Sequence, residues 1–442
     1  MSKNVLQPLD VNRTSMDRSP VRKRARYDSP VKEGWSLTSH NLKLDEVFDF
    51  GVGVLNSDSE TQTDDEECPR DASSYDDCLE PTAEPDEPAA DSISLDDWDG
   101  FLIKKPVISN TSIDQFCRLS DEVILHIFHF LPKRQLTQIA CVSKRFHRLT
   151  EDESLWARMD VSNRVLYPGA LGQILSRQVV ILRLAQSEIS HPAIMPDCRA
   201  SNEDFQSRLL YLDLSLVHVS PESLTSLFTK CQRLKKLSLE HVQINTEVLQ
   251  ALAQNKELEV LNLAMVQGIE VDGLKVLLKN CKKLRELNLA WTFLSCPSIK
   301  LLCAQLPKTL DRLNISGCRK LLTDNYVLDL VKSCPGLREL DLSDCTGLTG
   351  TAIHHIILLE DLNFLALSRC YLIPYRSLLT LKKVKSLVYL DVHGGYIDYT
   401  ELRIIQDGLG SHIHINKFKF SSVARPTVGA RRSSIWNMRV RD

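Results

Sequence analysis

Leucines recur with a fixed local pattern, L-x-x-L-x-L, through the second half of the chain. The pattern starts eight times at intervals of 24 to 27 residues, at Leu209, Leu234, Leu258, Leu284, Leu310, Leu337, Leu362 and Leu387. Its last leucines alternate with polar residues, which predicts short strands with one buried face. The segments between them, such as 272–280 and 298–305, read as helices.

One such unit is too small to shield its own leucines, so stacked neighbours must cover them. The period and pattern are those of leucine-rich repeats. We expect an α/β solenoid with parallel strands on a concave face and helices on a convex face. It should comprise about ten units over residues 156–416, including degenerate ones near Trp156 and Val179 and a distorted last strand at 412–416.

Residues 116–156 have helical rather than strand periodicity. Ser120 is placed to cap a first helix that Pro132 ends, and two further amphipathic helices follow, around Leu136 and Phe146. We expect the first helix to bury one face, formed by Val123, Ile124, Ile127 and Phe128. Three short helices have too little volume for an independent core, so the repeats or a partner must cover them.

Residues 1–110 lack apolar periodicity, which predicts a disordered regulatory region. A basic cluster, Arg22, Lys23, Arg24 and Arg26, is typical of a nuclear import signal, so we expect a nuclear and also cytoplasmic protein. Ser19 and Ser29 each precede proline and are candidate phosphorylation sites. Residues 57–99 hold seventeen Asp and Glu but one basic residue, Arg70, and are interpreted as a solvated, self-repelling linker.

The composition excludes several classes of protein. The thirteen cysteines form no CxxC pair, and those within the repeats should be buried, reduced packing residues. The sequence has no apolar run long enough to predict a membrane span. It also lacks the basic stripe that would predict nucleic-acid binding. No catalytic motif or phosphate-binding loop is present, and the histidines show no metal-binding arrangement. We expect a protein that is not an enzyme and that has no cofactor.

Residues 113–160 resemble an F-box, on the strength of LSDEVILHIFHFL (119–131), VSKRF (142–146) and the Leu155-Trp156 pair. Ser120 stands where the family has proline. An F-box followed by leucine-rich repeats is similar to the receptors of Skp–cullin–F-box ubiquitin ligases. The resemblance implies binding to a Skp adaptor, and through it to a cullin and a RING subunit. It assigns adaptor binding to Leu119, Glu122, Ile124, Leu125, Ile127, Phe128, Leu131, Val142, Phe146 and Trp156.

Residues of the types that dominate protein interfaces lie just after several predicted strands, at the rim of the array. They are Trp291, Arg319, Asp344, Arg369 and Tyr371. Between the leucines at 337–342, Glu339, Asp341 and Ser343 should face outward. We expect these residues, together with Asp344, to form the working surface.

The tail, residues 417–442, is basic and contains RPTVG (425–429) and Ile435-Trp436. It resembles the tail of F-box/leucine-rich-repeat receptors that direct cell-cycle inhibitors to ubiquitination. In those proteins the tail packs back on the repeats, and a small cyclin-kinase-subunit accessory protein docks there. The resemblance implies a phosphorylated cyclin-dependent-kinase inhibitor as substrate, in control of the G1/S transition. Two alternatives remain open: a receptor for unrelated substrates, and a repeat scaffold without a ubiquitin role.

Overall fold

The computed structural model describes residues 115–417, 421–429 and 434–440. The predictions for residues 1–110, including Ser19, Ser29 and the basic cluster at 22–26, lie outside this part of the chain.

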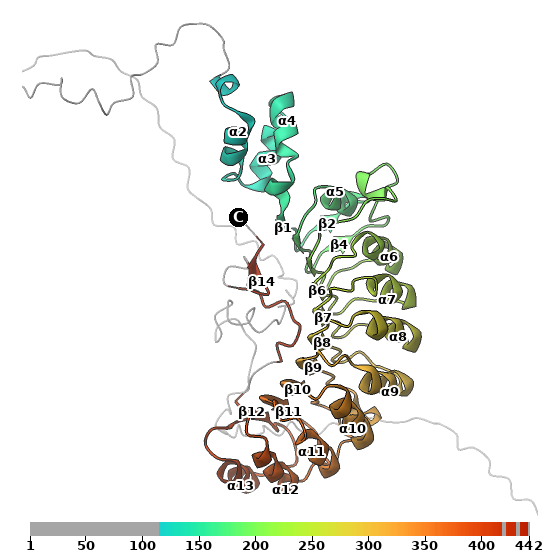
Figure 1. Cartoon of the computed structure of the whole chain (residues 1–442), viewed down its shortest axis with the longest axis vertical. Helices are drawn as coiled ribbons and strands as arrows, with labels where there is room; N and C mark the ends of the chain where they lie inside the picture. Colours follow the sequence, from blue (N-terminus) through green and yellow to red (C-terminus); the bar gives the residue numbers. More distant parts are fainter. Residues whose placement is uncertain (1–114, 418–420, 430–433, 441–442) are drawn as a thin grey trace, which may run out of the picture. The chain divides into compact units, whose positions relative to one another are not determined.

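Short helical segments open the described chain and form a unit of their own (Figure 1). They are η2 (Gln115–Arg118), α2 (Asp121–Phe128), α3 (Lys133–Ile139), α4 (Lys144–Thr150) and η3 (Glu153–Trp156). Their buried side chains form one small core, made of Ile124, Phe128, Leu136, Leu149, Leu155 and Trp156. We call residues 115–156 the helical unit.

The prediction of one buried face on α2 was wrong in part. Ile124 and Phe128 are buried, whereas Val123 and Ile127 are 47% and 41% exposed. Residues four apart lie on one side of a helix, and each adjacent position is rotated by about 100°. The small core covers only the stripe of Ile124 and Phe128, so the second pair faces outward.

Arg145 of α4 holds the start of the helical unit together. Its Nε donates to the Asp121 carboxylate over 2.8 Å, and its Nη atoms donate to the carbonyls of Phe116 and Leu119 at 2.8 and 2.6 Å. Ser120 does precede α2 as predicted, but its side chain makes no capping hydrogen bond to the helix backbone. The residues that turn the chain into α2 are therefore fixed by α4.

Eleven parallel strands form one sheet, in the order of the sequence (Figure 1). They are β1 (Arg158–Asp160), β3 (Ile181–Arg183), β5 (Tyr211–Asp213), β6 (Lys236–Ser238), β7 (Val260–Asn262), β8 (Glu286–Asn288), β9 (Arg312–Asn314), β10 (Glu339–Asp341), β11 (Phe364–Ala366), β12 (Tyr389–Asp391) and β13 (His414–Ile415). From β3 to β12 the central leucines lie in register, for example Leu313 beside Leu340 and Leu340 beside Leu365. The predicted solenoid is confirmed.

Helices cover one face of this sheet, where the leucines point. They are α5 (Ala170–Ser176), α6 (Pro221–Lys230), α7 (Thr246–Leu252), α8 (Val271–Asn280), α9 (Cys296–Gln305), α10 (Asp324–Ser333), α11 (Gly350–Ile356), α12 (Tyr375–Leu378) and α13 (Tyr399–Leu409), with 3₁₀ turns η4 (Arg199–Ser201), η5 (Arg319–Leu321) and η6 (Leu379–Lys383). Two small sheets complete the fold: parallel β2 (Val165–Leu166) and β4 (Glu188–Ile189), and antiparallel β14 (Ser434–Ile435) and β15 (Met438–Arg439). We call the opposite face, lined by the outward side chains of the strands, the strand face.

The repeat cysteines are packing residues, as predicted. The six at the recurring positions are buried and unpaired: Cys231, Cys281, Cys318, Cys334, Cys345 and Cys370. Burial raises the pKa of the Cys231 and Cys334 thiols to about 12, so both thiols stay protonated and unreactive at neutral pH.

Candidate functional site

The helical unit exposes five large apolar side chains. One is Phe116, and we call the other four, Val123, Ile127, Phe130 and Val142, the helical apolar face. Phe130 and Val142 are 77% and 69% exposed. Phe130 follows α2, and its ring meets the His126 ring edge to face, with centroids 5.3 Å apart. So many exposed apolar side chains on a unit of about forty residues indicate a binding surface for a partner.

The ten residues assigned to adaptor binding fall into three groups. Ile124, Phe128 and Trp156 are buried in the core of the helical unit, and Leu119, Leu125, Leu131 and Phe146 are half-buried against it. Glu122, Ile127 and Val142 are exposed. A buried side chain of the first group cannot contact the adaptor directly and can affect binding only by stabilising the helical unit. Phe130, which sequence reasoning missed, belongs to the exposed group.

Trp156 joins the helical unit to the first repeat. Its indole Nε1 donates to the Thr150 carbonyl over 2.7 Å. The guanidinium carbon of Arg177, which follows α5, lies 3.8 Å from the ring centroid. Such a stack of a cation on an aromatic face contributes about 1–2 kcal/mol when it is partly desolvated. The two parts of the chain therefore share a contact at this indole.

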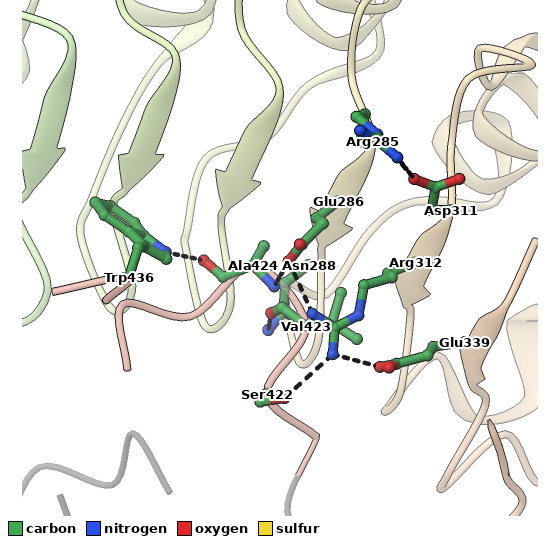
Figure 2. A network of polar contacts seen from close by, with 10 residues as sticks. All are labelled: Arg285, Glu286, Asn288, Asp311, Arg312, Glu339, Ser422, Val423, Ala424 and Trp436. Atoms are coloured by element: carbon green, nitrogen blue, oxygen red, sulfur yellow. Dashed lines mark hydrogen bonds and ion pairs between the residues drawn. The ribbon is translucent and has the colours of Figure 1, made fainter. Parts of the chain in front are cut away.

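The tail lies across the strand face and contacts strands far from it in sequence (Figure 2). Asn288 of β8 donates to the Val423 carbonyl over 3.0 Å, and the Ala424 amide donates to Glu286 over 3.0 Å. Val423 and Ala424 are buried against Val260 of β7. These contacts span about 135 residues of sequence.

Arg312 of β9 lies between two glutamates of neighbouring strands (Figure 2). Its guanidinium is 3.3 Å from Glu286 and 2.6 Å from Glu339, and it also donates to the Ser422 hydroxyl over 3.3 Å. The pairs are mostly buried, so bulk water screens them only in part. Further along, Arg425 pairs at 3.1 Å with Glu240, which follows β6.

The end of the tail packs on the first repeats. Ile435, Trp436 and Val440 form a buried cluster with Ile181 of β3, against which Tyr211 of β5 also packs. The Trp436 indole donates to the Ala424 carbonyl over 3.4 Å, which folds the tail onto itself (Figure 2). The tail thus covers the strand face from β9 back to β3.

We expect Glu240→Ala to loosen the tail without unfolding the repeats. The substitution leaves Arg425 buried without its carboxylate, and an unpaired buried charge costs about 1–3 kcal/mol. Amide hydrogen exchange of residues 421–429 should become about tenfold faster or more. Glu222→Ala, at an exposed site on α6, is the control and should leave that exchange rate unchanged. Equal exchange rates in both variants would contradict this role of the pair.

Three of the five predicted rim residues occupy a recurring backbone position. Trp291, Asp344 and Arg369 follow their strands with φ near +57°, where neighbouring repeats carry Gly317 and Gly394. This left-handed conformation costs a residue with a side chain about 1–2 kcal/mol. Backbone hydrogen bonds to the next repeat hold it, for example from the Asp344 amide to Ser368 at 2.8 Å.

Four of the five rim residues form two side-chain pairs, which the bond from the Arg319 amide to the Asp344 carbonyl joins over 3.1 Å. The Trp291 ring lies on Gly317, and the Arg319 guanidinium is 5.9 Å from the ring centroid. Arg369 makes a two-pronged pair with Asp344, which raises the pKa of the guanidinium. Tyr371 instead contacts Tyr396, with centroids 5.0 Å apart.

A pocket opens beside the pair of Trp291 and Arg319. It is lined by Thr292, Phe293, Leu294, Gly317, Cys318, Arg319, Lys320, Leu321 and Thr346. Phe293 and Leu321 are exposed apolar residues at this pocket, and neither was among the predicted contacts. Their signal in the sequence is their place just after a strand, as for Trp291, which could have identified Phe293 and Leu321 as rim residues.

Asp341, expected on the working surface, is instead a buried structural group. Its Oδ1 accepts from the Ser343 amide at 3.0 Å, and Asn314 donates to its other oxygen at 3.2 Å. Burial raises the pKa of the Asp341 carboxyl, and hydrogen bonds to Ser343 counteract the rise. Glu339 pairs with Arg312, so of the expected surface only Ser343 and Asp344 border the rim.

Among described residues 115–440, no group of His, Cys, Asp or Glu is arranged to hold a metal ion. No helix in the same part of the chain is long and apolar enough to cross a bilayer.

Comparison with known families matches both parts of the fold. Residues 116–162 match the family described as F-box-like, and residues 169–442 match the family described as SKP2 LRR domain. This chain belongs to the SKP2 LRR domain family. The SKP2 LRR domain match runs from the start of α5 through the tail, so the tail is part of the domain that defines the family. The chain is therefore an F-box/leucine-rich-repeat protein.

Individual relatives are more distant. F-box/LRR-repeat protein 12 of Mus musculus is 25% identical over 271 residues, which are 57% of this chain and 78% of that protein. Lysine-specific demethylase 2A of Xenopus tropicalis is 26% identical over 259 residues, 54% of this chain, and the match spans 22% of the demethylase. Among solved structures, a chain in the crystal structure of the Rad7 and Elc1 complex in yeast matches with a TM-score of 0.33 and 16% identity, over 62% of this chain and 69% of its own length.

Proposed function

We propose that this chain is the substrate-recognition subunit of a Skp–cullin–F-box ubiquitin ligase. The helical apolar face, on a unit that matches the F-box-like family, carries the proposal. A Skp adaptor would cover Val123, Ile127, Phe130 and Val142, and would link the chain to the cullin and the RING subunit. Burying large apolar side chains of this kind contributes about 1.5–3 kcal/mol each.

The receptor would act by proximity rather than by chemistry of its own. The helical unit holds the ligase at one end, and the repeats hold the substrate. Substrate lysines are then kept at a high effective concentration near the conjugating enzyme. The contact of Trp156 with Thr150 and Arg177 favours a fixed rather than a flexible connection between the two parts.

Within the family, we propose that the chain acts as an S-phase kinase-associated F-box/leucine-rich-repeat protein. Its substrates would be phosphorylated cyclin-dependent-kinase inhibitors, recognised in the nucleus with a cyclin-kinase-subunit accessory protein at the G1/S transition. The docked tail and the exposed rim groups around Trp291 and Arg369 support this reading, because they place a mixed aromatic and charged surface beside the strand face.

We expect Ile127→Glu combined with Val142→Glu to reduce binding of the Skp adaptor at least a hundredfold. Two carboxylates on the helical apolar face would have to be desolvated in the complex. The measurement is co-purification and calorimetric titration of the full chain with the adaptor. Val165→Glu combined with Tyr167→Glu is the control, because both positions are exposed and apolar but lie outside the helical unit.

Unchanged adaptor binding in the first variant would favour the repeat scaffold without a ubiquitin role. The finer proposal is tested by adding the accessory protein and a phosphothreonine peptide from a kinase inhibitor. The phosphorylated peptide should bind only when the accessory protein is present, and the unphosphorylated peptide should not bind. Adaptor binding without peptide binding would assign the chain to unrelated substrates.

A further inference from the structure

The edge of the sheet where the strands begin carries a row of exposed cations. In a parallel sheet all strands start at the same edge, so the loops that lead into them lie side by side. We call the loops before β6 to β12 the pre-strand edge. Its exposed cations without a described ion pair are Arg233, Lys256, Lys282, Lys308, Arg338 and Lys385.

Two further cations of this edge are neutralised by acids. Lys283 pairs with Glu257 at 2.6 Å, and Arg285 pairs with Asp311 at 2.5 Å. These pairs use acids of the same loops. Among residues 115–440 as described, no carboxylate lies within 4.0 Å of any cation in the row defined above. Taken together, the seven loops hold nine Lys and Arg and five Asp and Glu, so the edge is positive as a whole. The loop before β11 is the exception, since it carries the exposed acids Glu360 and Asp361 and no cation.

Helix dipoles explain the lysines at the ends of the helices but not the row of cations at the pre-strand edge. Lysines in the last turn of a helix are favoured by the negative end of its dipole, which accounts for Lys230, Lys279 and Lys332. That effect falls off beyond the last turn. Lys256 and Arg338 lie four and five residues past α7 and α10, where the helix gives them no such benefit.

We propose that the pre-strand edge binds the acidic segment of the same chain, residues 57–99. That segment has seventeen acidic residues and one arginine, so its charge is opposite to that of the edge. The solvated linker expected from the sequence would then be a ligand of the repeats. The rim residues, which follow the strands, lie at the other edge of the sheet and stay accessible.

Length and tethering are compatible with this occupant. Six intervals between seven strands span about 30 Å at about 4.8 Å each. A flexible stretch of the length that separates residue 57 from residue 115 has a typical end-to-end distance of about 40 Å. A tether of this kind gives millimolar effective concentrations, so many weak ion pairs suffice for docking.

Cleavage of the full chain by a glutamate-specific protease tests the proposal. Its cleavable sites in the segment are Glu60, Glu66 and Glu67, because proline follows each of the other three glutamates there. Salt at 300 mM screens exposed charges and should release the segment from the edge. We therefore expect cleavage at these sites to be at least about threefold faster at 300 mM than at 20 mM salt. A variant with Arg233, Lys256, Lys282 and Arg338 each changed to Gln should lose the low-salt protection.

The matched control changes Lys275, Lys300, Arg376 and Arg403 to Gln, four exposed cations on the helices. It removes the same net charge and should keep the protection. Loss of protection in this control would show a general charge effect and overturn the proposal. So would equal cleavage of the wild-type chain and the edge variant at 20 mM, or loss of protection in Lys417→Gln with Arg439→Gln, which would assign the segment to the tail.

Zero-length coupling of carboxylates to lysine amines gives a second readout on the same protein. We expect linked peptides that join residues 57–99 to Lys256, Lys282, Lys308 or Lys385. Links that run only to Lys275 and Lys300 would place the segment on the helices and contradict the proposal.

Discussion

Trp156→Ala should destabilise the helical unit by about 3–5 kcal/mol, the range found when a large buried aromatic residue is truncated. The indole is 3% exposed and fills the core against Leu155 and Phe128. Its removal also leaves the Thr150 carbonyl without its donor and Arg177 without its stacking partner. We expect hydrogen exchange of α2 to α4 to rise towards that of an unfolded chain, while strands β6 to β12 keep their protection.

Trp156→Phe separates packing from the hydrogen bond. The smaller ring keeps much of the core filled but cannot donate to Thr150, so a loss of about 1–2 kcal/mol is expected. Urea denaturation followed by exchange measurements checks both variants. Equal stability of the alanine variant and the wild type would show that the helical unit does not depend on this residue. Because Trp156 is buried, adaptor binding lost in the alanine variant would report unfolding and not a lost contact.

Gly268→Ala is expected to be the most costly small change in the repeats, at about 2–5 kcal/mol. Gly268 has φ +91°, and a Cβ there would lie 1.9 Å from the carbonyl oxygen of Ile244. The neighbour is backbone and cannot turn away, so overpacking adds to the conformational cost. Thermal unfolding of the full chain measures the effect.

Gly336→Ala provides the matched control for that experiment. No atom lies within 4 Å of a Cβ built at Gly336, and its backbone is not left-handed. Its effect should stay within about 0.5 kcal/mol, as for ordinary surface changes. Similar losses in both variants would mean that the close approach at Gly268 does not limit stability.

The repeats could be predicted from sequence because their contacts are between neighbours. Leu340 packs beside Leu313 and Leu365, which occupy the same position of the repeat in adjacent units. The repeat pattern therefore predicts which residues contact each other. The strands, most helices and the buried cysteines followed from it.

The surfaces were harder to predict because they depend on distant or backbone features. The bond from Asn288 to Val423 joins two segments that no local pattern connects. The left-handed position of Trp291 aims its ring at Gly317, and a residue type alone does not show this. On α2, the small size of the helical unit left Ile127 outside, where a larger core would have buried it.

The tail changes what kind of folding unit the repeats form. In a stacked array each unit touches only the next one, and such arrays can unfold piecewise from their ends. Here the chain after β13 returns from Tyr389, which bonds to the Lys417 carbonyl, through Arg312 and Glu286 to Ile181. Late residues thus tie the last repeats to the first. The array gains cooperativity beyond nearest neighbours, and during synthesis it gains this only once residues 421–440 have been made.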